Sequence, residues 1–146
     1  MIQKEKLSLK WSTYRQFTPE NVRLPPMPIA LRNFGLYVPN EQPVPQGPGV
    51  YALFVRTKNL LKPFRVFYIG QTEELKDRLE GHLSDSEPNG VIRRKVSRKV
   101  TYFKYAPLAK TLDRDRVERS LILKYRPACN DLNQVPGSPD VEVDIF

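Results

Sequence analysis

One glutamate of the sequence lies where an unpaired charge would be costly. Glu118 stands between Val117 and Leu121-Ile122 in a predicted helix, so its carboxylate points near the apolar face. Burying an unpaired carboxylate costs free energy, and a bound divalent cation would relieve that cost. Mg²⁺ commonly takes one or two carboxylates and completes its octahedron with water and phosphate oxygens. The alternative is an ion pair of Glu118 with Arg114 or Arg119.

Arg78 and His82 lie four residues apart, on the same side of another predicted helix. A guanidinium binds phosphate through two parallel hydrogen bonds and stays charged. An imidazole, with a reference pKa of about 6.5, can take a proton from water or from another side chain near neutral pH. Together they would suit a site that binds phosphate and transfers a proton. The alternative for Arg78 is an ion pair with Glu74 at i−4.

Tyr51 and Tyr68 fall on neighbouring strands of a predicted hairpin. Aromatic residues in strands usually belong to the core, so both side chains could serve packing alone. A phenol has a reference pKa of about 10 and is a weak base at neutral pH. A nearby Arg78 and a metal ion would favour the phenolate and so give a tyrosine a chemical role.

The elements that position these side chains follow from the spacing of apolar residues, glycines and prolines. Residues 49–55 and 64–69 predict a hairpin, and residues 100–106 predict a third strand. Residues 73–83 and 112–125 have apolar side chains at helical spacing, and residues 91–98 predict a shorter helix. The sequence therefore predicts a small α/β domain with a three-stranded antiparallel sheet flanked by helices.

Two details of the first predicted helix affect where it begins and how it packs. Thr72 is a good N-cap residue, so we expect the helix to begin directly after it. Gly81 lies inside the helix and costs roughly 1 kcal/mol relative to alanine. A close contact between this helix and the sheet would explain the glycine.

The order of these motifs resembles the signature of a nuclease family. Gly49-Val50-Tyr51 followed by Tyr68-Ile69-Gly70 looks like the paired motif of the GIY-YIG nucleases, with Val for the middle Ile. Arg78 and His82 match family positions, and the run from Glu118 to Asn130 resembles the acidic helix and closing asparagine of the family. The resemblance covers about residues 47–132.

The resemblance implies a divalent-metal-dependent endonuclease that cuts DNA to a 5′-phosphate and a 3′-hydroxyl, with Mg²⁺ or Mn²⁺ as cofactor. It implies that both tyrosine hydroxyls face the phosphate, with Tyr51 as the base or base relay and Glu118 as the metal ligand. Tyr68 and His82 would orient the water, and Asn130 would tie the last loop to the site by hydrogen bonds. The expected catalytic residues are Tyr51, Tyr68, Arg78, His82, Glu118 and Asn130.

The charge of the sequence favours a polyanionic partner. The net charge is +8, and residues 91–104 contain six Lys and Arg but no acid. A concentrated basic segment is typical of nucleic-acid binding, although it could equally be a solubilising surface. An alternative function is therefore a catalytically inactive nucleic-acid-binding module that uses residues 91–104. The expected contacts to nucleic acid are Arg93, Arg94, Lys95, Arg98 and Lys99.

Length and composition predict one domain with extensions. Residues 1–47 form a predicted proline-rich arm packed on the core, residues 48–132 the nuclease domain and residues 133–146 a tail whose alternating Val141 and Val143 could pair as an edge strand. With no apolar run of membrane-spanning length, no apolar leader and one cysteine, we expect a cytoplasmic protein without a membrane partner. We expect a restriction-like or repair-like role, because little chain follows the core, and a possible homodimer.

Overall fold

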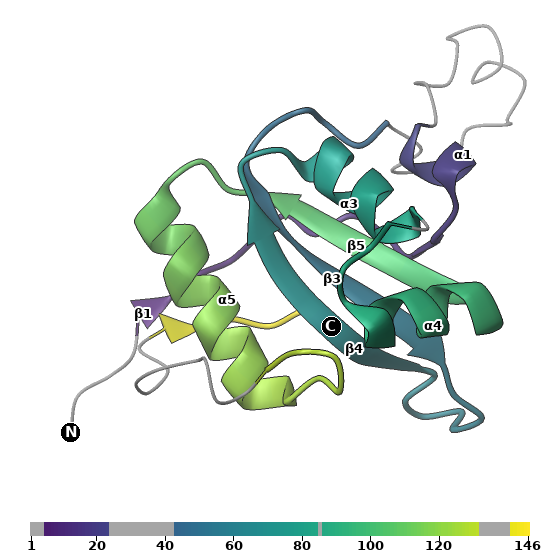
Figure 1. Cartoon of the computed structure of the whole chain (residues 1–146). Helices are drawn as coiled ribbons and strands as arrows, with labels where there is room; N and C mark the ends of the chain where they lie inside the picture. The colour runs from purple at the N-terminus through teal and green to yellow at the C-terminus, as the bar shows by residue number, and fades with distance from the viewer. Residues whose placement is uncertain (1–4, 24–42, 85, 132–140) are drawn as a thin grey trace, which may run out of the picture.

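A four-stranded antiparallel sheet in the order β2-β5-β3-β4 forms the centre of the molecule (Figure 1). The computed structural model describes residues 5–23, 43–84, 86–131 and 141–146. The sheet contains β2 (Arg15–Gln16), β3 (Gly49–Arg56), β4 (Phe64–Thr72) and β5 (Thr101–Pro107). A separate pair joins β1 (Glu5–Lys6) and β6 (Val141–Glu142) in parallel.

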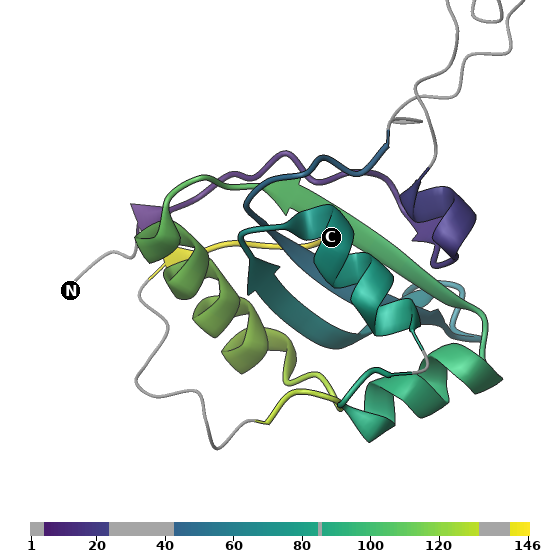
Figure 2. The ribbon, with the colours of Figure 1, turned by 45° about the horizontal axis from the view of Figure 1, so that its top comes forward.

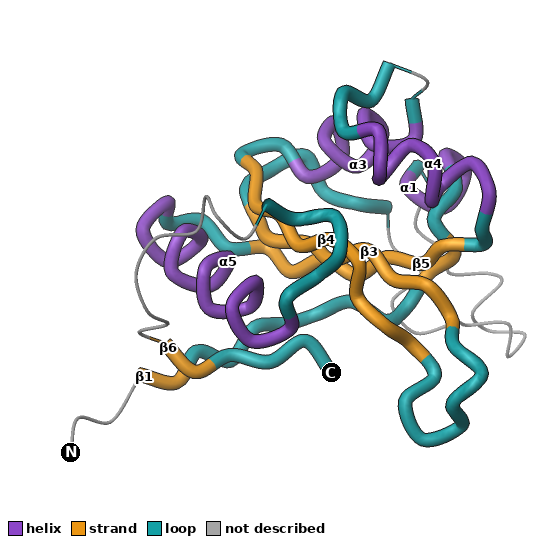
Figure 3. The backbone as a smooth tube through the Cα atoms, turned by 60° about the horizontal axis from the view of Figure 1, so that its bottom comes forward, coloured by secondary structure: helices purple, strands orange, loops and turns teal. Residues whose placement is uncertain are grey.

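Helices cover both faces of this sheet (Figures 2 and 3). On one face lie α1 (Pro19–Val22), α3 (Leu75–Leu83) and α4 (Gly90–Arg98). On the other face lie α5 (Thr111–Tyr125) and β6. Each face has its own apolar core, so the sheet is the middle layer of three.

Strand β3 is buried on both faces, which explains why its sequence is a continuous apolar run. Side chains alternate along a strand, so Tyr51 and Leu53 face α3 while Val50 and Ala52 face α5. The alternation thus brings Tyr51 to the side of the sheet on which α3 packs.

Strand β4 contains a bulge that changes the direction of one side chain. Its pairing with β3 shifts register between Leu53 and Phe54, and Phe67 is left as the extra residue. Phe67 and Tyr68 therefore both pack on the α3 side, although they are consecutive. The bulge places Tyr68 next to Tyr51 without interrupting the core.

The prediction of three strands is wrong, because β2 adds a fourth at the edge of β5. Arg15 pairs with Phe103 and Gln16 with Tyr102. Two residues are too few to show the alternation by which a strand is recognised in a sequence. The edge strand expected in the tail is confirmed in part, since β6 pairs with β1 and Val141 and Val143 are buried.

The predicted helix start at residue 73 is also wrong. Thr72 belongs to β4, and its hydroxyl accepts a hydrogen bond from the Glu74 N–H at 3.0 Å in a turn that precedes α3. The expected close contact at Gly81 is absent as well, since a Cβ added there would meet no atom of the described residues within 4 Å.

The predicted proline-rich arm falls in part on residues 24–42, which lie outside the described residues. On either side of that range, Phe17, Val22 and Val44 are buried in the core beneath α3 and α4. None of the helices in the described ranges has the length and apolar character needed to cross a membrane.

Candidate active site

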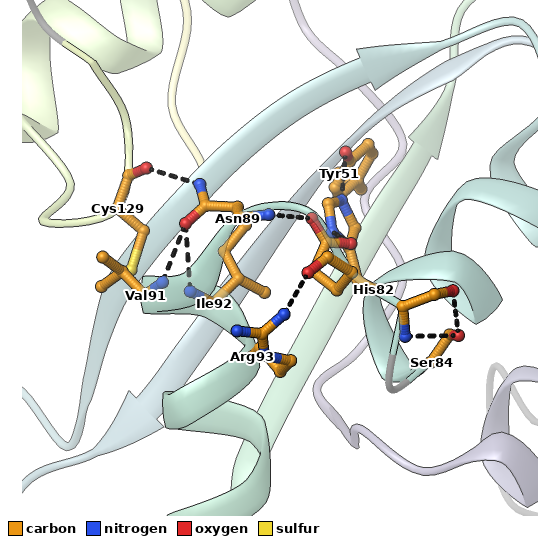
Figure 4. Close-up of polar contacts among 10 residues, drawn as sticks. Tyr51, His82, Ser84, Asn89, Val91, Ile92, Arg93 and Cys129 are labelled. Carbon is orange, nitrogen blue, oxygen red and sulfur yellow. Dashed lines mark hydrogen bonds and ion pairs between the residues drawn. The ribbon is translucent and has the colours of Figure 1, made fainter.

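Three buried side chains from β3, α3 and the loop after α3 form a hydrogen-bonded line, and Figure 4 labels the first two, Tyr51 and His82. The Tyr51 hydroxyl lies 2.7 Å from Nε2 of His82, and Nδ1 of His82 lies 2.8 Å from Oε2 of Glu87. The three residues are 0%, 1% and 2% exposed, so these bonds are shielded from bulk water.

Tyr68 and Arg78 lie beside this line. The ring centroid of Tyr68 is 6.1 Å from that of Tyr51 and 5.2 Å from that of His82. The charge of Arg78 acts on the hydroxyls of both tyrosines. The described residues contain no ion pair between Arg78 and Glu74. The alternative in which Arg78 serves only to pair with Glu74 is therefore wrong.

Burial decides the resting protonation of the line. It raises the pKa of Tyr51 and of Tyr68 above the ordinary value, and the charge of Arg78 lowers both by less. Burial also lowers the pKa of His82, against the opposing charge of Glu87. At neutral pH, Tyr51 is therefore a phenol and His82 is a neutral imidazole that can accept a proton.

Glu118 lies half-buried on α5, where the backbone N–H of Gln71 donates to its carboxylate. Burial and, to a smaller extent, the charge of Asp115 raise the pKa of Glu118 to about 7, against the lowering effect of the Gln71 N–H. Arg114 does not pair with it, since its guanidinium donates instead to Gln71 Oε1 at 3.1 Å and to two backbone carbonyls.

This environment fits a divalent cation held by one protein carboxylate. Within the described ranges, no three His, Cys, Asp or Glu side chains gather into a larger ligand set. Mg²⁺ is suited to such a position, because it keeps several waters and binds phosphate oxygens beside one or two carboxylates. A cation would also offset the free-energy cost of a carboxylate in this half-buried position.

The Asn130 side chain bonds the loop after α5 to the outer edge of β4. Its Oδ1 accepts a hydrogen bond from the Ile69 N–H at 2.9 Å, and its Nδ2 donates to the Ile69 carbonyl at 2.8 Å. The Cys129 N–H donates to the carbonyl of Phe67 at 2.9 Å. The loop after α5 is thus fixed to the strand that carries Tyr68.

The basic segment is divided between the two faces of the sheet. Lys104 lies on the α5 side, where its Nζ donates to the Ile145 carbonyl at 3.0 Å. Lys95 is half-buried, with Nζ 5.9 Å from the centroid of the Phe67 ring. The remaining members are exposed on or directly after α4, on the same face of the sheet as His82: Arg93, Arg94, Arg98 and Lys99.

Glu87 and Asn89 are not among the residues predicted from the sequence. Glu87 falls in an acidic stretch that reads as solvated surface, and Asn89 falls in a Pro-Asn-Gly turn. The available signal was weak: Glu87 follows His82 by five residues, and Asn89 directly precedes a predicted helix as an N-cap should.

Comparison with known proteins identifies the fold and the family. The family model of the GIY-YIG catalytic domain matches residues 47–133. No curated relative matches the sequence. The magnesium-bound N-terminal endonuclease domain of UvrC from Thermotoga maritima is 24% identical, with a TM-score of 0.47, and the match covers 72% of this chain and 100% of that one.

A point mutant of the same UvrC domain, bound to its catalytic divalent cation, is 24% identical with a TM-score of 0.46 and covers 72% of this chain and 99% of its own. The family assignment rests on the family model, which spans more than half of the sequence and includes every residue of the cluster described above. The chain belongs to the GIY-YIG family.

Proposed function

We propose that this chain is a divalent-metal-dependent endonuclease that hydrolyses DNA phosphodiester bonds. The main support is the Tyr51 hydroxyl, which lies 2.7 Å from Nε2 of His82 while the charges of Arg78 and Glu118 act on the same hydroxyl. A phenol, a proton acceptor, a phosphate-binding cation and a metal-binding carboxylate thus act around the Tyr51 hydroxyl.

In the proposed reaction, Arg78 binds a phosphate oxygen and orients the phosphodiester. Tyr51 passes its proton to Nε2 of His82, and its phenolate then takes a proton from water. The water oxygen forms a bond to phosphorus while the bond to the 3′ oxygen breaks, and that oxygen takes up a proton from solvent. A cation at Glu118, Mg²⁺ or Mn²⁺, would stabilise the charge that develops on the phosphate.

The exposed cations of α4 are the proposed contact surface for the rest of the DNA. Arg93, Arg94, Arg98 and Lys99 lie on the same face of the sheet as Tyr51 and His82. Lys95, which is half-buried against Phe67, would contribute its charge from the edge of that surface. Phosphate contacts of this kind position a duplex without reading its sequence.

We propose a restriction-like or repair-like role for this endonuclease. One active site cuts one strand at a time, so a double-strand break needs two copies of the chain or two successive events. We therefore propose a homodimer for any reaction that cuts both strands together.

Nicking of a supercoiled plasmid tests the proposal. The wild-type protein should nick in Mg²⁺ or Mn²⁺ and not in excess EDTA. Tyr51→Phe removes the hydroxyl and keeps the ring, and should lower the rate by about a hundredfold or more while DNA binding persists. DNA binding by the wild type without cleavage in either metal would favour the inactive nucleic-acid-binding module.

A further inference from the structure

Glu87 is a buried carboxylate that the proposed reaction does not use. Its side chain is 2% exposed, and both carboxylate oxygens are bonded. Oε2 lies 2.8 Å from Nδ1 of His82, and Oε1 accepts the Asn89 N–H at 3.1 Å. Glu87 therefore differs from a solvated surface carboxylate, because it is buried and each of its oxygens faces a hydrogen-bonding group.

These contacts fix the hydrogen on the imidazole ring. A carboxylate accepts hydrogen bonds, so Nδ1 of His82 must carry its hydrogen toward Glu87. A neutral imidazole has one N–H, so Nε2 carries the lone pair and faces the Tyr51 hydroxyl. The other tautomer would turn an N–H toward that hydroxyl and leave Glu87 facing a bare nitrogen.

The loop that carries Glu87 is held from several directions, and Figure 4 labels Asn89, Arg93 and Cys129 among the residues that hold it. The Glu87 N–H donates to the Ser84 carbonyl at 3.1 Å, and Arg93 Nη1 donates to the Glu87 carbonyl at 3.0 Å. Asn89 caps α4 through Oδ1, which accepts the N–H groups of the first turn, and its Nδ2 donates to the Cys129 carbonyl at 3.2 Å. α3, α4 and the loop after α5 thus fix the position of the carboxylate.

We propose that Glu87 is a positioning residue: it holds His82 in the Nδ1–H tautomer and stabilises the imidazolium that forms when Nε2 takes the Tyr51 proton. The proton leaves the tyrosine oxygen and binds Nε2, while the Nδ1–H stays on His82 and Glu87 remains a carboxylate. The inference rests on the proposed function only in naming Tyr51 as the proton donor. The tautomer itself does not depend on any activity.

The charges around His82 make such a partner necessary. Its ring faces Glu87 from the loop, Arg78 from its own helix, Tyr51 from β3 and Tyr68 from β4. Among these groups, the charge of Arg78 disfavours an imidazolium and that of Glu87 favours it. Without Glu87, the proton acceptor would form its cation next to a guanidinium with no counter-charge.

The chain offers a direct measurement, because His82 is its only histidine. Labelling with ¹⁵N-histidine gives imidazole signals that report on this one ring. In the wild type near neutral pH, we expect a protonated Nδ1 and an unprotonated Nε2. The opposite tautomer would overturn the proposal, whether or not the protein cleaves DNA.

Glu87→Gln tests the consequence. A glutamine can either accept from or donate to Nδ1, so the tautomer preference should weaken, and single-turnover nicking should fall by about a hundredfold with DNA binding unchanged. The acid limb of the pH–rate profile should move to lower pH, since loss of the carboxylate lowers the pKa of His82. Normal nicking by Glu87→Gln, or a fall with the tautomer and acid limb unmoved, would overturn the positioning role.

Two further variants separate positioning from a loss of stability. Glu80 lies on the same helix as His82 and forms a surface ion pair with Arg23. Glu80→Gln removes that carboxylate and should leave the His82 tautomer and the nicking rate unchanged. In a His82→Gln background, Glu87→Gln should cause little further loss of nicking, because it acts through the imidazole. Additive losses would show that Glu87 acts independently of His82 and would overturn the proposal.

Discussion

The ring of Tyr51 lies across the backbone of Gly70, the residue with which it is paired between β3 and β4. A Cβ on Gly70 would overlap the hydroxyl and the adjacent ring atoms of Tyr51. The position of the Tyr51 ring therefore requires a glycine at residue 70, the last residue of the Tyr68-Ile69-Gly70 motif. This contact links the two halves of the paired motif through packing.

Gly70→Ala should displace Tyr51 from His82. Overpacking of this kind costs roughly 1–3 kcal/mol of stability, and nicking should fall by about a hundredfold as the proton path lengthens. Gly81→Ala is the matched control, because a Cβ there meets no described atom within 4 Å. Replacing a glycine inside a helix by alanine should also stabilise the fold by roughly 1 kcal/mol. Thermal unfolding and plasmid nicking measure both; full activity of Gly70→Ala would contradict the assigned geometry.

Arg78→Ala should leave the protein folded and able to bind DNA but nearly inactive. The side chain is exposed, and its charge acts on the tyrosine hydroxyls. Arg78→Lys keeps the charge but loses the two-pronged grip on phosphate, so it should recover a small part of the rate. Circular dichroism, DNA binding and nicking are the measurements. A collapse of the melting temperature in Arg78→Ala would make this arginine a structural residue.

Glu118→Gln should separate metal binding from folding. Burial raises the pKa of Glu118 to about 7, so removing its charge should leave the metal-free protein as stable as the wild type or slightly more so. Metal affinity should fall sharply, because a neutral amide is a much poorer ligand for Mg²⁺. Calorimetric titration of metal with uncleavable DNA, alongside nicking, measures both; equal metal affinity would remove Glu118 from the site.

The exposed cations on α4 should govern the salt dependence of DNA binding. Replacing Arg93, Arg94, Arg98 and Lys99 by alanine removes up to four phosphate contacts, and should reduce the slope of log K against log salt by up to ~4 units. Binding isotherms at several salt concentrations give the slope. An unchanged slope would show that this face of α4 points away from the DNA.

His82 should make stability depend on pH. Its folded-state pKa is lowered by burial, so the unfolded chain binds the proton more tightly. The stability contributed by the buried neutral ring is therefore present above pH ~6.5 and is lost as pH falls through the folded-state pKa. Denaturant unfolding from pH 5 to 8 should show this slope in the wild type and not in His82→Gln. Parallel curves for the two proteins would rule out His82 as the cause.

The positions of the site elements could be predicted because each has a strong local pattern. The run at Gly49–Arg56, the stripe of Leu75 and Leu79 and the long helix ending before Pro127 are set by apolar spacing and by residues that break regular structure. The start of α3 was misplaced by two residues because Thr72 has the chemistry of a cap, while β4 continues through it. At Thr72 the pairing of β4 with β3 outweighs the local preference of threonine for a helix N-cap.

The sequence by itself determined the types and order of the reactive residues, and hence the family, because a paired motif with an arginine, a histidine, a glutamate and an asparagine in order is readable along the chain. Only the tertiary structure decided how they are used. Burial keeps Tyr51 protonated. The Asn130 side-chain amide bonds to the backbone of Ile69, and Glu87 lies beside His82. Burial, tautomer and hydrogen-bond direction depend on groups from different helices, strands and loops. The spacing of residues along the sequence does not show which of these groups come into contact in the folded protein.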